Sequence, residues 1–389
     1  MGYLSSRLLV GVGLWLSLFG KDSGLPMANA IPSSLLQKCF HMDALHYRNI
    51  VLNGYAFDVH RKSPVAFFPL YPLLARGVML VTGCPVEVAL LLVANLALLG
   101  AFIAFAYYAR LRFANMSDAW IGGCVMLLAA WPTGFFAHMA YAEGLLLLLM
   151  LLVFIGMERS WPMLVLALLT ALATATRPVG IALLVPMVMH VFQRYPSAAQ
   201  RCLAWLVYVP IGLSGLLVYM AFLAGAFDDP LAFARTQEHW TMGHKSKELQ
   251  QKLISLFTFE PVWGAWSEGS VHYWKQHDTL PWYSSMIFMN PIYFLIAVLS
   301  LFLGVWFRKL NSKEWMLGFL LVAIPYLTRA YEMSMGSMGR FVSVIFPMFF
   351  SLTVILAALP WLVRLGIGLL LAVGMVSYSY HYALGYAIF

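Results

Sequence analysis

The sequence has little charge: Asp, Glu, Lys and Arg make up 10% of its 389 residues, against about 25% in soluble domains. Hydrophobic residues make up 62%, more than a water-soluble globule can bury. The chain is therefore expected to be an integral membrane protein. Its apolar blocks are long and continuous, which predicts helices rather than the alternating strands of a membrane barrel.

Acidic residues are the scarcer kind of charge, with 16 Asp and Glu against 24 Lys and Arg and a net charge of +8. In a soluble protein this excess would suggest nucleic acid as a partner. Here the basic residues stand at the ends of apolar runs, where they orient the chain and meet anionic lipid. We therefore expect membrane lipids as partners and no nucleic acid.

Motifs of soluble enzymes are also missing, including the Rossmann glycine fingerprint, the P-loop, His-Glu-x-x-His and Gly-x-Ser-x-Gly. The four cysteines lack metal or redox spacing, although Cys39 and Cys84 could meet in one external segment. Asp228 and Asp229 are adjacent, so their side chains diverge and support no metal site. Without repeats, residues 1–389 are expected to form a single membrane domain.

Eleven apolar blocks are expected to span the membrane, so the predicted fold class is an all-α, multi-span helical bundle. The blocks cover residues 8–20, 85–109, 119–137, 141–157, 162–176, 178–192, 203–224, 284–307, 315–328, 341–359 and 361–378. Several are shorter than the roughly 20 residues that cross a bilayer upright, so their bounds are approximate. No clear cleavage site follows the first block, which we expect to be an uncleaved span.

Basic residues predict the orientation of this bundle. With the N-terminus in the cytoplasm, every short inside segment carries Arg or Lys, as the positive-inside rule requires. Two long segments, about residues 21–84 and 225–283, then lie outside. The polar residues that remain converge on the same outer face, and they are Asp43, His46, Glu143, Arg177, Arg329, Glu332 and Arg340.

The first outer segment places several reactive side chains together. Residues 37–53 have helical spacing, and Asp43, His46 and Tyr47 fall at positions i, i+3 and i+4 of one face. This face presents an acid beside an imidazole and a phenol. Two simpler interpretations stay open: a capping or surface carboxylate for Asp43, and a solvated histidine for His46.

An aromatic, proline-kinked segment follows, Phe67-Phe-Pro-Leu-Tyr-Pro72. Such a stretch suits the membrane interface, where aromatic rings accumulate. Together with Tyr47, the side chains of Phe67, Phe68 and Tyr71 could line a groove for a lipid chain or an acceptor. Interfacial anchoring without substrate contact explains the same residues.

Glu143 and two arginines stand where charge is costly. An acid at bilayer depth costs about 2.5–3.5 kcal/mol on insertion scales, so Glu143 is expected to have a task or to be the structural partner of Arg177 or Arg340. Both arginines fall at helix ends on the outer side. A phosphate is an obvious counter-ion, because guanidinium groups match its oxygens bidentately. A lipid headgroup would meet the same requirement.

The second outer segment contains several tryptophans, which either cover sugars or lie in the membrane interface. They are Trp240, Trp263, Trp266, Trp274 and Trp282. Composition alone does not choose between the two roles.

Four segments in this order resemble the GPI mannosyltransferase 2 family, including its short bacterial homologues. They are Asp43-Ala44 with Tyr47 and Gly54-Tyr55, Phe67-Phe-Pro-Leu-Tyr-Pro-Leu-Leu74, Tyr141-Ala-Glu143, and Thr176-Arg177-Pro-Val-Gly180. A looser match extends to Arg340. This chain has Met42 where members have an aromatic residue, and Gly144 where they have serine.

The resemblance implies a GT-C glycosyltransferase that takes a sugar, mannose in that family, from a polyprenyl-phosphate donor outside the cytoplasm. It implies an inverting mechanism in the plasma membrane, with a glycan or glycolipid as acceptor. Asp43 is then the expected general base, with His46 and Glu143 as further catalytic candidates. Arg177, Arg340 and Arg329 are expected on the donor phosphate. No metal or other cofactor is expected, because the arginines carry the positive charge.

Two other function classes fit the residues alone. A transporter or flippase of a lipid-linked or anionic solute would use the same buried charges, but transporters usually show internal repeats and a midplane site. A non-catalytic membrane scaffold would use the outer polar residues to bind a partner, and it would tolerate Asp43→Asn.

Overall fold

The computed structural model describes residues 1–20, 34–241 and 249–386, and within these ranges every regular element is a helix. The expected all-helical membrane architecture is confirmed. Residues 21–33 and 242–248, which belong to the predicted outer segments, and residues 387–389 lie outside the described residues.

Five of the described helices are long and apolar enough to cross a membrane. They are α1 (Gly2–Leu16, extended by a 3₁₀ turn to Phe19), α5 (Val86–Arg112), α10 (Ala198–Phe227), α14 (Met286–Trp306) and α18 (Trp361–Ala383). A sixth candidate is α6 (Asp118–Ala130) with the 3₁₀ helix η3 (Pro132–His138), a pair bent by 74°. The break falls at Pro132, which cannot donate a backbone hydrogen bond.

The other predicted spans coincide with shorter helices. These are α7 (Glu143–Glu158), α8 (Met163–Thr176), η4 (Pro178–Leu183) with α9 (Leu184–Arg194), α15 (Ser312–Arg329), and α16 (Met338–Val342) with α17 (Phe346–Ala357). Every predicted block is thus helical, while the number of helices that cross the membrane stays a prediction.

The helix expected over residues 37–53 is broken, so this prediction is wrong. The chain forms a short α2 (Ser34–Gln37), a turn, and then α3 (Asp43–Asn53). The hydroxyl of Tyr382 on α18 donates to the carbonyl of His41 at 2.9 Å and accepts from its N–H at 3.1 Å. A contact with the far end of the sequence therefore satisfies the backbone that a continuous helix would have used.

The span expected over residues 341–359 is also interrupted, between α16 and α17. Pro347 stands in the first turn of α17. Proline is favourable there, because that position needs no backbone hydrogen bond, and it restricts the residue before it. The break leaves α16 as a separate short helix that carries Arg340.

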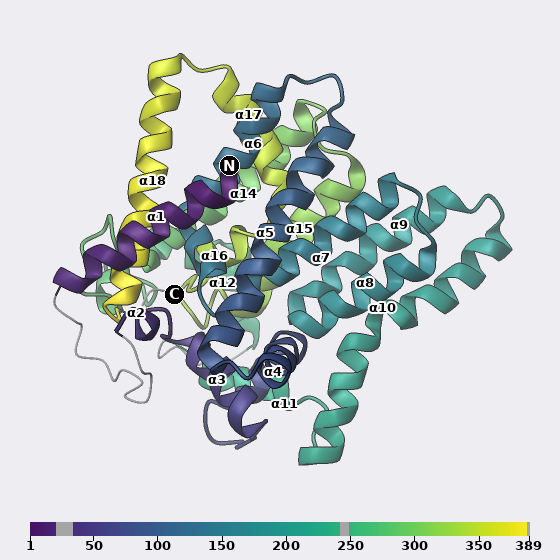
Figure 1. The fold of residues 1–389 in the computed structure, drawn as a ribbon, viewed down its shortest axis with the longest axis horizontal. Coiled ribbons are helices and arrows are strands. Elements are labelled where there is room, and N and C mark those ends of the chain that lie inside the picture. The colour runs from purple at the N-terminus through teal and green to yellow at the C-terminus, as the bar shows by residue number, and fades with distance from the viewer. Residues whose placement is uncertain (21–33, 242–248, 387–389) are drawn as a thin grey trace.

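Helices of the two outer segments collect at one end of the bundle. Figure 1 shows α2, α3, α4 (Leu70–Thr82) and α11 (Ala232–Arg235) toward its lower end, and α3 contacts both α4 and η2 (Pro64–Ala66). The remaining short elements are η5 (Thr236–His239), α12 (Leu249–Phe257), α13 (Glu260–Trp263), η6 (Gly264–Trp266) and η7 (Trp274–Gln276).

Ion pairs fix which helix ends meet at each end of the bundle. At the end of α5, Arg112 contacts Glu314 in the first turn of α15 and Glu158 in the last turn of α7. The opposite termini of α7 and α15 carry Glu143 and Arg329, about 22 Å away at 1.5 Å per residue. Both helices therefore deliver a charged residue to the end where α3 lies.

Candidate functional site

A cavity of about 390 Å³ lies between α3, η4, α15, α16 and the segment around η5. Eight of the residues predicted for the site line it: Asp43, His46, Tyr47, Phe67, Phe68, Arg177, Arg329 and Arg340. Glu143 is buried directly beside the arginines, and Tyr71 lies in the core. Segments almost 300 residues apart in the sequence thus form one site.

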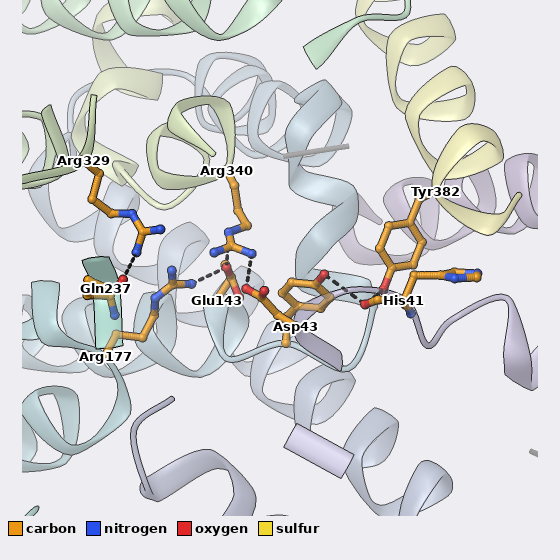
Figure 2. A network of polar contacts seen from close by, with 9 residues as sticks. His41, Asp43, Glu143, Arg177, Gln237, Arg329, Arg340 and Tyr382 are labelled. Atoms are coloured by element: carbon orange, nitrogen blue, oxygen red, sulfur yellow. Dashed lines mark hydrogen bonds and ion pairs between the residues drawn. The ribbon is translucent and has the colours of Figure 1, made fainter. Parts of the chain in front are cut away.

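Asp43 is the first residue of α3, and the turn before it sets its position. Met42 precedes it with a φ of 52°, a left-handed conformation that a side chain of this size rarely adopts. The hydroxyls of Tyr382 and Tyr141 both donate to the carbonyl of His41, which anchors the turn (Figure 2). Backbone strain in this turn is held by contacts from α18, through Tyr382, and from the turn between η3 and α7, through Tyr141.

The carboxylate of Asp43 faces Arg340. Arg340 Nη1 donates to Asp43 Oδ2 at 2.5 Å, and the two side chains are 11% and 17% exposed (Figure 2). Met42 is the N-cap residue of α3, so Asp43 does not cap this helix. Burial by itself raises the pKa of Asp43, but Arg340, His46 and Arg177 together outweigh burial and hold the pKa below its ordinary value. The carboxylate is therefore ionised at neutral pH.

Glu143 joins two arginines through one oxygen. Its Oε1 accepts a hydrogen bond from Arg177 Nη1 and lies 3.1 Å from Arg340 Nε, an ion pair without hydrogen-bond geometry (Figure 2). Glu143 is 1% exposed, and its Oε2 has no hydrogen-bond partner among the described residues. These are the pairs expected of a structural partner, and they also fix the orientation of both guanidinium groups.

Arg329 differs from the other two arginines because no described carboxylate pairs with it. It ends α15, and its Nη1 donates to the neutral amide oxygen of Gln237 (Figure 2). Arg177 and Arg340 are balanced by Glu143 and Asp43. Within the described cluster, three guanidinium groups therefore face two carboxylates, which leaves an uncompensated positive charge beside the cavity.

Aromatic rings hold His46 in the wall of the cavity. Its ring stacks on Phe67 with centroids 4.8 Å apart and meets Trp240 edge to face with centroids 5.2 Å apart. Burial lowers the pKa of His46; the neighbouring Asp43 carboxylate raises it, but burial together with the nearby Lys62 outweighs that effect. The imidazole is consequently neutral at pH 7, and it adds positive charge beside Asp43 only in the acidic range where it is protonated.

The two tyrosines predicted for the groove lie in different places, one in the cavity wall and one behind it. Tyr47 lines the cavity and meets Phe67 edge to face, with centroids 5.1 Å apart. Tyr71 is completely buried outside the cavity wall, where its hydroxyl donates to the carbonyl of Leu90 at 2.9 Å. Its role is therefore to support Tyr47, whose ring it contacts at 4.8 Å.

One side of the cavity is apolar. Val179 of η4, Ile324 and Pro325 of α15, and Phe341 of α16 line it. Pro178, a lining residue of η4, is also exposed on the surface of the bundle. The cavity thus combines a cationic centre with an apolar side that reaches the surface.

Sequence reasoning missed Lys62 and Gln237, which also line the cavity. Lys62 lies with its Nζ 5.1 Å from the centroid of the Trp240 ring. Neither residue belongs to a pattern, and a neutral amide such as Gln237 has no charge to attract attention. Trp240 stood out only as one of several outer tryptophans.

The four cysteines are free thiols, including Cys39 and Cys84. Their disulfide, which the sequence left open, is absent. Asp229 pairs with Arg235, and no group of metal-ligating side chains occurs in the part of the chain that the structure describes.

No protein-family model and no curated protein sequence matches the chain. Among solved structures, ArnT from Cupriavidus metallidurans bound to undecaprenyl phosphate aligns with a TM-score of 0.49 at 15% identity, over 97% of this chain and 75% of ArnT. The Archaeoglobus fulgidus oligosaccharyltransferase, tethered with an acceptor peptide, aligns with a TM-score of 0.45 at 12% identity, over 99% of this chain. The chain spans 55% of that enzyme's length. At these values any functional assignment rests on the geometry of the site.

Proposed function

We propose that this chain is a membrane glycosyltransferase of the GT-C type, which transfers a sugar from a polyprenyl-phosphate donor to an acceptor hydroxyl. One observation carries the proposal: a single cavity joins an ionised carboxylate, an excess of arginine and an apolar side that reaches the bundle surface. A lipid-linked phosphate needs the last two features, and activation of a hydroxyl needs the first.

The donor phosphate binds at Arg329 and Arg177. Arg329 is the arginine of the cluster that no described carboxylate neutralises, so the electrostatic stabilisation of a bound anion is largest there. Planar guanidinium groups match phosphate oxygens with paired hydrogen bonds. The polyprenyl chain leaves along Val179 and Ile324 toward the exposed Pro178. Arg340 contacts the phosphate from its place between Asp43 and Glu143.

Asp43 is the general base. The acceptor oxygen attacks the anomeric carbon from the side opposite the phosphate, and its proton moves to Asp43 Oδ1 or Oδ2. The bond between the anomeric carbon and the phosphate oxygen breaks, and its electron pair leaves with polyprenyl phosphate, so configuration inverts. The three arginines stabilise the negative charge that grows on this leaving group. Their fixed charge takes the part that a metal ion plays in other transferases.

His46 and Glu143 support this chemistry without reacting. The neutral His46 ring shapes the wall beside Asp43 through its stack on Phe67. Glu143 holds two guanidinium groups near each other and orients them, because both contact its Oε1. Mannose as the sugar and a glycan or glycolipid as the acceptor follow the sequence resemblance described above.

A direct test uses the purified chain in lipid nanodiscs with synthetic polyprenyl phosphate mannose and a mixture of glycolipid acceptors. We expect polyprenyl phosphate and a mannosylated acceptor to appear in equal amounts. Polyprenyl phosphate glucose, offered in parallel, tests the sugar separately. Movement of intact donor between leaflets without any product would instead identify a flippase.

We also propose that the site faces outward across the plasma membrane. The basic residues of the short loops support this orientation. In a cysteine-free background, Arg61→Cys should react with an impermeant thiol reagent in intact cells, because this side chain is 80% exposed. Arg364→Cys, on the opposite side and also exposed, should react only after lysis. The reverse pattern would invert the orientation.

A further inference from the structure

A second cavity of about 480 Å³ adjoins the first. The two share Gln237, Trp240, Thr241, Thr328, Arg329 and Met333 as lining residues, so only these side chains separate them. The second cavity adds Glu238, His239 and Glu332, which do not line the first. It is therefore next to the first cavity, behind a shared wall, but differs from it in charge.

Three buried polar atoms of its lining residues have no hydrogen-bond partner among the residues described. They are Nε1 of Trp240, Nε of Arg329 and Oε2 of Glu332. Two of them donate and one accepts. A hydroxyl group can meet both needs, since it donates one hydrogen bond and accepts others. Buried polar groups in proteins are nearly always paired, so these atoms point to a hydroxyl-bearing ligand.

Existing contacts hold each of these side chains in place. Glu332 Oε1 pairs with Lys252, which leaves Oε2 available. Arg329 is fixed through Nη1 on Gln237, and its Nε remains. The Trp240 ring is set by edge contacts with His46 and Phe67 at 5.2 and 5.7 Å. The unpartnered atoms therefore belong to preorganised side chains.

Charge distinguishes the occupants of the two cavities. Arg177 and Arg340 line the first cavity and not the second, whereas Glu238 and Glu332 line the second and not the first. The second cavity keeps Arg329 but adds these two carboxylates, of which Glu332 is paired with Lys252. It therefore lacks the excess positive charge of the first cavity and favours a phosphate less. Carboxylates and an indole suit the hydroxyls of an uncharged sugar.

We propose that the second cavity binds the acceptor and that the acceptor presents a neutral sugar there, with Glu332 and Trp240 as specificity-determining residues. This inference rests on the proposed function. Because Trp240 and Arg329 line both cavities, a sugar bound in the second directs one hydroxyl past these side chains toward the first, where Asp43 lies. The other hydroxyls bond to Glu332 Oε2 and Trp240 Nε1.

The test measures two affinities separately on the full chain in nanodiscs. Saturation-transfer NMR follows methyl α-mannopyranoside, methyl β-glucopyranoside and methyl β-galactopyranoside as soluble acceptor probes. Competition with a fluorescent polyprenyl phosphate follows the donor site. We expect saturable binding of at least one of these glycosides. Glu332→Gln and Trp240→Phe should each weaken it at least about fivefold, a loss in line with one hydrogen bond. Glu332 lines only the second cavity, so Glu332→Gln should leave polyprenyl phosphate affinity unchanged, whereas Trp240 lines both, so Trp240→Phe should weaken polyprenyl phosphate less than it weakens the glycoside.

Glu332→Gln removes the charge partner of Lys252 and could therefore misfold. Trp240→Phe keeps an aromatic ring and gives a second, independent test of the site. Trp263→Phe is the matched control, because Trp263 lines neither cavity and its indole N–H donates to the carbonyl of Thr258. It should bind as the unmodified chain does.

Absence of glycoside binding, unchanged binding in both variants, or equal weakening of polyprenyl phosphate would each overturn the acceptor site. Failure of polyprenyl phosphate to bind the unmodified chain would overturn the proposed function instead. The two failures are therefore distinguishable.

Discussion

Two buried clusters of carboxylate and arginine occupy opposite ends of α7 and α15, and they are built differently. At one end, Glu314 is completely buried and both its oxygens are satisfied. Oε1 accepts from Tyr108 at 2.6 Å and from Arg112 Nε at 2.9 Å. Oε2 accepts from Arg112 Nη2 at 3.1 Å and from the N–H of Asn311 at 2.7 Å.

At the other end, the cluster of Asp43, Glu143 and three arginines is incomplete. Glu143 Oε2, Arg329 Nε and Arg340 Nε have no hydrogen-bond partner among the described residues, and the other oxygen of Glu143 is shared by two guanidinium groups. This cluster lines a cavity, and Glu314 does not. A cluster whose hydrogen bonds are all satisfied fastens helices, whereas an unsaturated one with excess positive charge is suited to a ligand.

The largest effect is expected from Asp43→Asn. General-base catalysis is typically worth about 10²–10⁴ in rate, and the amide keeps the shape of the carboxylate but accepts no proton. Turnover in the nanodisc assay should fall by this factor, while polyprenyl phosphate affinity stays within a few fold. Turnover close to that of the unmodified chain would remove Asp43 as the base and favour Glu143.

The matched pair Glu314→Gln and Glu143→Gln tests the contrast directly. Glu314→Gln removes the nearer of the two carboxylates that pair with Arg112 and leaves only Glu158 at 3.9 Å, and breaking a buried pair typically costs about 3–5 kcal/mol. Its thermal unfolding temperature should fall, with turnover of the folded protein unchanged. Glu143→Gln releases two guanidinium groups beside the cavity, and misplaced groups cost about 10² in rate. Equal losses of stability and turnover in both variants would erase the distinction between the clusters.

Arginine substitutions are expected to have the next largest effect. Arg329→Gln should lower turnover about 10²-fold and weaken donor binding, because removal of one donor from a preorganised anion site typically has this effect. Arg329→Lys should recover only part of the loss, since a lysine offers a point charge in place of a planar fork. Arg177→Lys and Arg340→Lys should also lose activity.

Arg112→Lys, in the cluster around Glu314, is the control. It should lower the unfolding temperature and leave donor affinity unchanged. If Arg329→Lys behaves in the same way, Arg329 is a structural anchor and does not bind the phosphate.

The sequence predicts those parts of the site that depend on local helical spacing and on the distribution of charge. Asp43, His46 and Tyr47 share a helical face, and their spacing alone predicted it. The positive-inside rule brought Arg177 and Arg340 to the same end of the bundle as Asp43. The rule could not predict that Arg340 pairs with Asp43, because the two residues are 297 positions apart and no periodicity links them.

Where the sequence misled, a distant contact outweighed a local preference. Spacing favours a helix through residues 37–53, but the bonds between Tyr382 and His41 stabilise a turn there. The interruption before α17 had a visible signal in Pro347, which favours the first turn of a helix. Gln237 had no such signal, and its contact with Arg329 depends on the path of a loop.

The smallest expected effect is a change in the shape of the pH profile. The groups that lower the pKa of Asp43 from its ordinary value of 3.8 are Arg340, His46 and Arg177, and together they outweigh burial. Stability from the Asp43–Arg340 pair is therefore present above 3.8 and lost as pH falls through the lowered pKa. Turnover of the unmodified chain should show no acidic limb from Asp43 between about pH 4 and 8.

In Arg340→Gln the burial of Asp43 remains while its nearest cation is gone, so the pKa of Asp43 rises and an acidic limb enters that range. Arg177→Gln should shift the limb less, because Arg177 bonds to Glu143 and not to Asp43. Profiles normalised to each variant's own maximum make the comparison independent of total activity. Identical profiles in all three proteins would mean that Asp43 is not the group whose ionisation controls turnover.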